Sequence, residues 1–290
     1  MLFCLFINFS IFAERHWLTI PFVQTFVFLI TVYEAISFER KLQGGTTSPW
    51  IVIVEDRHQV VPFVVKLYTK PQHTYSPKLC EVICSALAPH FGLDVPPYGF
   101  VNFDPSFIHE LNNEQKEQLK RKDSRINFAT QFIEGSFKFE DALTRNYLTH
   151  YPIDTIFAFD TMVFNVDRWA GKPNILFKEH KSWLIDHEKT FPFNEDESVA
   201  RIMNGQWQYD HRKHIFFEYL KNARANAKLN FFSEFFSYLS NIDFDVLDGY
   251  VDRMNELGLP TENFEVIKEY LQLVKRNRTS FVQNLRSVVT

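Results

Sequence analysis

The hydrophobic pattern of this 290-residue chain changes its period along the sequence, and this change constrains the fold more than any other feature. Residues 35–42, 50–54 and 60–68 read as strands, and the short polar turns between them favour an antiparallel meander. Beyond residue 140 the pattern becomes helical, with four or five amphipathic helices over 197–290 and a break at Pro260. The sequence therefore predicts an α+β fold, with a β-rich half and a helical half that join near residues 131–135.

Between the meander and the join, the signals alternate between helix and strand. Ser76 followed by Pro77 is a typical helix start, and Gly92 is a typical helix end. Strands are predicted at 98–103 and 127–133, with a charged, solvated helix over 110–125 between them. We therefore expect a helix between Ser76 and Gly92, with apolar residues at Leu79, Val82, Ile83, Ala86 and Leu87.

Glycine and charge exclude several nucleotide and nucleic-acid classes. The nine glycines form neither G-x-G-x-x-G nor G-x-x-x-x-G-K-[ST], so the Rossmann fingerprint and the standard P-loop are absent. With 31 basic and 35 acidic residues, the chain has no basic excess for binding nucleic acid, and the run Lys275–Arg278 is too short to suggest it. A 46% hydrophobic content is enough for a large core, in one large or two small domains.

Residues 1–35 are read as an apolar N-terminal extension. Its two apolar runs, 1–13 and 20–33, both fall short of the roughly 18 residues of a membrane span, and no basic region or A-x-A site marks a signal peptide. A targeting segment and a start codon assigned too far upstream are the alternatives, and whether 1–35 belongs to the mature protein stays open. Three cysteines build no disulfide framework, so we expect a cytoplasmic location, with Cys80 and Cys84 in the core.

Lys66 lies inside the apolar run 62–68, where a buried ammonium group requires an anion. The helix that begins at Ser76 offers Glu81 near its start. A ligand phosphate could serve equally well. The alternative is a lysine on the solvent face of an edge strand.

Two aspartates flank a predicted hairpin. Asp167 lies in the polar loop 165–174, which follows an apolar helix, and Asp186 comes directly after the strand 183–185. Taken alone, each aspartate is typical of a turn. Together with Asn174 they can converge on a hard cation, and Mg²⁺ prefers such oxygen ligands.

The order of these features is specific. A glycine-containing turn, a strand lysine, a helix glutamate, Asp…Asn and then a strand-borne Asp follow one another as in protein-kinase-like folds. The sequence resembles the compact HipA-like kinase family over about residues 36–195. The matching stretches are GGTTSPW (44–50), FVVKLY (63–68), CEVICSALAPHFGLDVP (80–96), FNVDRWAGKPNIL (164–176) and WLIDH (183–187).

The resemblance implies a two-lobed fold, with an N-lobe at 36–130 and a C-lobe at 131–290. It implies that Lys66 holds the nucleotide phosphates, that Glu81 orients Lys66, and that Asp167 accepts or orients the proton of the attacking hydroxyl. Asn174 and Asp186 would coordinate Mg²⁺, and Arg168 would support the loop or neutralise phosphate. The implied nucleotide-binding backbone consists of a phosphate-covering turn (Gly44, Gly45, Thr46, Thr47 and Ser48), a hinge (Gln131, Phe132 and Ile133) and the hinge exit at Gly135.

The implied activity is ATP- and Mg²⁺-dependent transfer of the γ-phosphoryl group to a protein Ser or Thr hydroxyl. Two departures leave an alternative open, a pseudokinase that acts as a nucleotide-dependent binding module. Lys172 stands where such loops commonly carry Asn, and Glu188 stands where a Gly follows Asp-His. The Asp167-Arg168 pair is similar to phosphoinositide-type kinases and leaves open a kinase of lipids or small alcohols.

Two further stretches carry structural predictions. His211 and His214 lie among charged residues and are interpreted as a solvated helix start rather than a metal site. The aromatic residues of 231–238 recur at helical spacing, so we expect them to pack in the core of the helical half.

Overall fold

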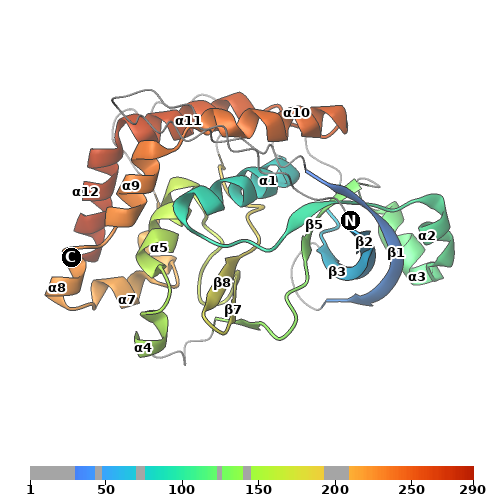
Figure 1. The fold of residues 1–290 in the computed structure, drawn as a ribbon, viewed down its shortest axis with the longest axis horizontal. Helices are drawn as coiled ribbons and strands as arrows, with labels where there is room; N and C mark the ends of the chain where they lie inside the picture. The colour runs from blue at the N-terminus through green and yellow to red at the C-terminus, as the bar shows by residue number, and fades with distance from the viewer. Residues whose placement is uncertain (1–29, 43–47, 70–75, 123–125, 140–144, 193–208) are drawn as a thin grey trace, which may run out of the picture.

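The protein is described by a computed structural model that covers residues 30–42, 48–69, 76–122, 126–139, 145–192 and 209–290. Figure 1 shows a small barrel on one side and a helical region on the other, with one helix and a hairpin between them. The α+β prediction is confirmed. The barrel strands are β1 (Val32–Lys41), β2 (Trp50–Asp56), β3 (Gln59–Val65), β4 (Tyr98–Asn102) and β5 (Ile126–Gln131).

The barrel closes in the order β1-β2-β3-β5-β4. The predicted meander is confirmed, because β1 pairs antiparallel with β2 and β2 pairs antiparallel with β3. The closure itself was not predicted: β1 pairs parallel with β4, with Val32 opposite Phe100. Such a pairing joins strands far apart in the sequence, and a hydrophobic period carries no information about partners.

The other elements of the described residues are helices and a second small sheet. Between β3 and β4 in the chain come α1 (Pro77–Leu87) and η1 (Ala88–Phe91), and between β4 and β5 come α2 (Pro105–Glu110) and α3 (Asn113–Lys120), which lie beside the barrel in Figure 1. The second sheet consists of β6 (Phe137–Lys138), β7 (Ile175–Lys178) and β8 (Lys181–Leu184), in that spatial order. The remaining helices are α4 (Arg145–Leu148), α5 (Ile153–Met162), η2 (His211–Lys213), α7 (Phe217–Lys221), α8 (Ala225–Lys228), α9 (Ser233–Asn241), η3 (Phe244–Leu247), α10 (Asp248–Glu256), α11 (Phe264–Arg276) and α12 (Arg278–Val289).

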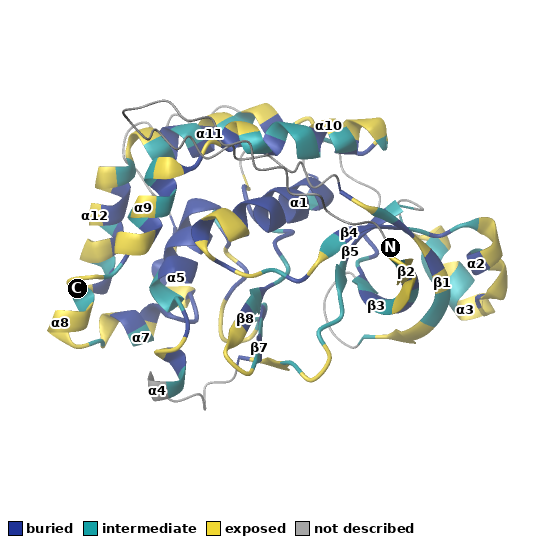
Figure 2. Cartoon of the chain, viewed as in Figure 1, coloured by how far each residue is buried: buried dark blue, intermediate teal, exposed yellow. Residues whose placement is uncertain are grey.

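Helix α1 connects the two regions. Its start matches the prediction, because the Ser76 side chain accepts a hydrogen bond from the Leu79 amide at 3.3 Å and Pro77 opens the helix. The helix is buried on nearly all sides, as Figure 2 shows, and its buried residues include the charged Lys78 and Glu81. Its residues share one core with the C-terminal helices, whereas the barrel interior forms a separate cluster around Trp50 and Phe63.

Several predicted boundaries differ from the structure. The strand expected over 60–68 ends at Val65, because its partner β2 begins at Trp50, opposite Val65. The helix expected over 110–125 is confined to Asn113–Lys120, where Asn112 and Gln115 form a capping box. The end of the N-terminal extension, from Val32 onward, is part of β1. Within the described ranges, no helix is both long enough and apolar enough to span a membrane.

Candidate functional site

The end of β3 directs Lys66 towards α1. Phe63, Val65 and Leu67 are buried inside the barrel, so the alternation of a strand turns Lys66 and Tyr68 to the outer side. The backbone amide of Lys66 still donates to the Phe128 carbonyl at 3.0 Å, which keeps this alternation beyond the last β3 residue.

Lys66 meets two carboxylates from distant parts of the chain. Its ammonium group donates to Glu81 of α1, and it donates to Asp186 at 2.7 Å. Burial alone would lower the pKa of Lys66, but Asp186 and Glu81 outweigh it and hold this pKa above the ordinary lysine value. Burial likewise raises the pKa of Asp186, yet the Lys66 charge prevails and keeps it below its usual range. The structure thus brings Lys66, Glu81 and Asp186 together as an ion-paired group.

Glu81 lies at the base of this group, with 1% of its surface exposed. Its carboxylate accepts hydrogen bonds from the Tyr68 hydroxyl at 3.3 Å and from the His187 amide at 3.1 Å. Burial raises the pKa of Glu81, against the opposing influence of Lys66. These contacts link α1 to the segment after β8, so the position of Lys66 depends on both regions.

Asp186 follows β8 with a left-handed backbone, φ 63°. The neighbouring Glu188 is not among the residues with positive φ, so the Glu that replaces the expected Gly introduces no such strain there. Burial, followed by the charge of Asp186, raises the pKa of Glu188 to about 7. Oxygens of Glu81, Asp186 and Glu188 lie within 4.8 Å of one another, a donor set whose chemistry fits Mg²⁺.

Asp167 lies in the loop after α5, with 6% of its surface exposed. Its carboxylate accepts from Lys172 at 3.3 Å and from Lys189 at 3.2 Å. Its backbone carbonyl accepts from the Asn174 side chain at 3.1 Å, and its amide donates to the Asn165 side chain at 3.1 Å. Asn174 is therefore adjacent to Asp167, and its own carbonyl accepts from the Ile185 amide at 3.1 Å, next to Asp186.

A buried cluster of charged and polar side chains, formed by Asp160, Arg168 and His214, supports the loop that contains Asp167. Arg168 is bound by Asp160 of α5 and donates to the Asn174 carbonyl, and the side chains of Arg168 and Asp160 are both 0% exposed. Of the two roles expected for Arg168, its burial favours support of the loop. Asp160 also accepts from Asn165 at 2.9 Å and lies 3.0 Å from His214.

The prediction of a helix start is confirmed, because η2 begins at His211, but the prediction that His211 and His214 are solvated is wrong. Both side chains are buried, and the 3₁₀ helix η2 presents them to the core. The His214 Nδ1 accepts from the Phe216 amide at 3.1 Å, so its Nε2 carries the proton and donates to Asp160. Their charged sequence neighbours concealed this, because Arg212 and Lys213 point outward while the histidines point inward.

The other two predicted groups lie at the barrel. Gly44, Gly45, Thr46 and Thr47 are outside the described residues, and Ser48 lies at the start of the described segment before β2, with φ 46°. In the hinge, the Gln131 amide donates to Pro97 at 2.7 Å and the Phe132 amide donates to Pro62 at 2.9 Å. These two N–H groups hold the hinge to the barrel.

Four residues at the site were missed by the sequence reasoning: Tyr68, Asp160, Glu188 as part of a carboxylate cluster, and Lys189. Glu188 and Lys189 directly follow Asp186, so the short stretch after the strand 183–185 contained a usable signal. Asp160 lies within an apolar helix and carried no signal beyond its charge.

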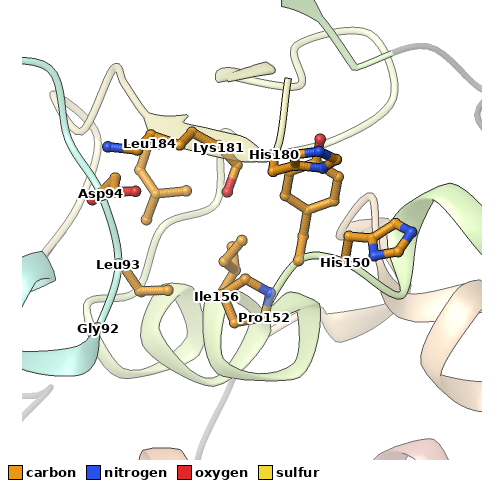
Figure 3. Close-up of a pocket in the computed structure, with 11 residues that line it drawn as sticks. Gly92, Leu93, Asp94, His150, Pro152, Ile156, His180, Lys181 and Leu184 are labelled. Carbon is orange, nitrogen blue, oxygen red and sulfur yellow. The ribbon is translucent and has the colours of Figure 1, made fainter. Parts of the chain in front are cut away.

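A pocket beside the β7–β8 hairpin is separate from the site formed by Lys66, Glu81, Asp167 and Asp186. Figure 3 shows it between the end of η1, the start of α5 and the edge of β8. Its lining contains none of Lys66, Asp167 and Asp186. The residues that line it include Leu93, Asp94, His150, Ile156 and His180.

Comparisons with known proteins agree with the order of the motifs. No curated protein matches the sequence significantly. The crystal structure of a Helicobacter pylori proinflammatory kinase, CtkA, aligns with a TM-score of 0.48 and 11% identity, over 87% of this chain and 95% of that chain. The family model of the HipA-like kinase matches residues 35–242. Because this match extends over well more than half of the chain, the protein belongs to the HipA-like kinase family and is a phosphotransferase with a protein-kinase-like fold.

Proposed function

We propose that this protein transfers the γ-phosphoryl group of Mg²⁺-bound ATP to a Ser or Thr hydroxyl of a protein. One observation carries the proposal: Lys66, Glu81 and Asp186 are brought together from segments up to 120 residues apart. Asp167 is linked to this group through Asn174, which bonds to the Asp167 carbonyl and to the Ile185 amide. Phosphoryl transfer needs such a set, since it relies on positioning and on neutralised charge. Membership of a kinase family implies ATP.

Each residue has a role in this proposal. Lys66 binds the α- and β-phosphates and is held by Glu81, which also accepts a hydrogen bond from the Tyr68 hydroxyl. Mg²⁺ would be held by Asp186 and Asn174, and it would neutralise the phosphate oxygens. Asp167 orients the acceptor hydroxyl and receives its proton. The adenine lies against the hinge, where the Ile133 amide or the carbonyl oxygens meet it, because the Gln131 and Phe132 amides already bind the barrel.

The lobe division at 36–130 and 131–290 and a cytoplasmic location are part of the same proposal. The hinge lies at the end of β5, where the barrel gives way to the second sheet. The cytoplasmic location is supported by Cys80 and Cys84, which are buried thiols that are not joined in a disulfide.

A polypeptide acceptor is supported by the surface beside Asp167. Val166 and Trp169 flank it in sequence and are 51% and 43% exposed. Large exposed apolar side chains next to the base can contact an extended peptide segment, whereas a small polar alcohol gains little from them.

The test is transfer of labelled phosphate from ATP, with wild type compared with Asp167→Ala and Asp186→Ala. Positioned acid–base groups contribute about 10²–10⁴-fold, so we expect each variant to lose at least about a hundredfold in rate while keeping its circular dichroism spectrum. Asp252→Ala, on an exposed position of α10, is the matched control. Full activity in Asp167→Ala would refute the assignment of the base.

Two other results would redirect the function. Thermal stabilisation by Mg²⁺-ATP without turnover would favour the binding module, and at a ligand concentration of about 100 times Kd it amounts to about 2.7 kcal/mol. A labelled small molecule in lysate without any labelled protein would favour the kinase of lipids or small alcohols.

A further inference from the structure

Two lysines share the one carboxylate proposed as the base. Lys172 contacts Oδ2 of Asp167 at 3.3 Å and Lys189 contacts Oδ1 at 3.2 Å, so each oxygen has its own ammonium group. A single carboxylate neutralises only one of the two. The remaining positive charge lies at the surface of the site, because the lysine side chains are 33% and 42% exposed.

The backbones that carry these lysines are held in place. Lys172 closes a tight turn with Trp169, with amide-to-carbonyl hydrogen bonds of 2.8 and 3.1 Å in both directions. Lys189 lies in a turn where Thr190 donates to the His187 carbonyl through both its amide and its hydroxyl. These turns fix where the two lysine side chains begin, and a rotation of the side chains alone can direct the ammonium groups to a nearby anion.

Lys172 and Lys189 also lie between Asp167 and the segment that contains Asp186 and Glu188. Their attachment points follow Asp167 by five residues and Asp186 by three. The charge of Lys172 acts on Asp186, and that of Lys189 acts on Glu188. In the proposed function the γ-phosphate lies between Asp167, the base, and Asp186, which would hold Mg²⁺. The ammonium groups of Lys172 and Lys189 lie at the edge of this region.

We propose that Lys172 and Lys189 bind the γ-phosphoryl group of ATP, and that they leave the Asp167 carboxylate when they do so. This inference rests on the proposed function. A terminal phosphate carries more negative charge than one carboxylate and offers more acceptor oxygens, so it competes well for an ammonium group. The exchange also frees both carboxylate oxygens of Asp167, which can then accept a hydrogen bond from the attacking hydroxyl.

In this proposal Lys172 contributes to phosphate binding at the position where a kinase loop commonly carries Asn. An ammonium group there contributes positive charge directly, whereas Asn contributes it through a bound divalent cation. The departure in sequence is therefore compatible with catalysis.

The test compares binding of the β,γ-imido analogue of ATP with binding of ADP, both with Mg²⁺, by titration calorimetry. Wild type is compared with Lys172→Met, Lys189→Met and the double variant. We expect the preference for the analogue to fall by roughly ten- to a hundredfold in the double variant, and ADP affinity to change less than about twofold. The charge-retaining pair Lys172→Arg with Lys189→Arg is expected to keep most of the preference.

The matched control is Lys120→Met. Lys120 is 70% exposed on α3 and pairs with Glu117 at 2.6 Å, so this variant removes an equal charge away from the site. An unchanged preference in the double variant, or an equal loss of both ligands, would overturn the inference and leave the proposed function intact. If wild type binds neither nucleotide, the proposed function fails and the inference fails with it. If the double variant does not fold, as judged by circular dichroism, the two single variants decide the question by the same ratio.

Discussion

The buried charge cluster of Asp160, Arg168 and His214, which supports the loop 165–174, leads to a prediction about stability. Asp160 accepts hydrogen bonds from Arg168, Asn165 and His214, and its side chain is 0% exposed. Asp160→Ala removes the anion and leaves the Arg168 guanidinium in the core without its carboxylate. We expect this variant to be less stable than wild type and to hold the loop less firmly.

The magnitude follows from the burial of both partners. Removing one member of a buried ion pair costs about 3–5 kcal/mol, a large part of the roughly 5–15 kcal/mol that stabilises a typical domain. At about 2–4 °C per kcal/mol for a large domain, the thermal midpoint should fall by roughly 10 °C. Burial alone would raise the pKa of Asp160, but Arg168 and then His214 keep it well below its usual range. The stabilisation therefore persists above the ordinary aspartate pKa and disappears only as the pH falls through the lowered value.

The assay is urea unfolding at pH 7, followed by circular dichroism. Asp160→Ala combined with Arg168→Met removes the unpaired charge as well, so the double variant should recover part of the loss. Asp252→Ala on α10 is the exposed control and should stay within about 0.5 kcal/mol of wild type. A cost below about 1 kcal/mol for Asp160→Ala would refute the reasoning, because it would mean that the buried guanidinium does not depend on this carboxylate.

Two further predictions concern single contacts. Glu81→Gln removes the charge that orients Lys66, so we expect kcat/KM for ATP to fall by about one to two orders of magnitude, measured in the transfer assay. An unchanged value would exclude this role for Glu81. For His211, burial and then His214 lower the pKa to about 4. Its neutral form is favoured in the folded state, so stability is present above its unfolded pKa near 6.5 and is lost as the pH falls towards 4. His211→Phe keeps the aromatic packing against Tyr209 and Phe157 but has no group to protonate. Between pH 7 and pH 4, we expect its free energy of unfolding, measured with urea, to fall by up to about 3 kcal/mol less than that of wild type. Equal losses in the two proteins would argue against this.

Local chemistry was readable in the sequence wherever it depends on neighbours along the chain. The start of α1 at Ser76-Pro77, the β1–β3 meander and the packing of Phe232 and Phe235 follow from capping, alternation and helical period. The order of Lys66, Glu81, Asp167, Asn174 and Asp186 was enough to indicate the family, because each residue type in that order matches one task of phosphoryl transfer.

The tertiary structure alone decided which groups meet. Three features join residues that are far apart in the sequence. They are the closure of the barrel by β1 and β4, the core shared by α1 and the C-terminal helices, and the charged groups around Asp160. The burial of His214 and the pairing of Lys172 and Lys189 with Asp167 belong to the same class. A hydrophobic period determines which face of an element is buried, and it contains no information about the partner across that face. For this reason the sequence indicated a phosphotransferase, whereas only the fold showed two lysines at its proposed base.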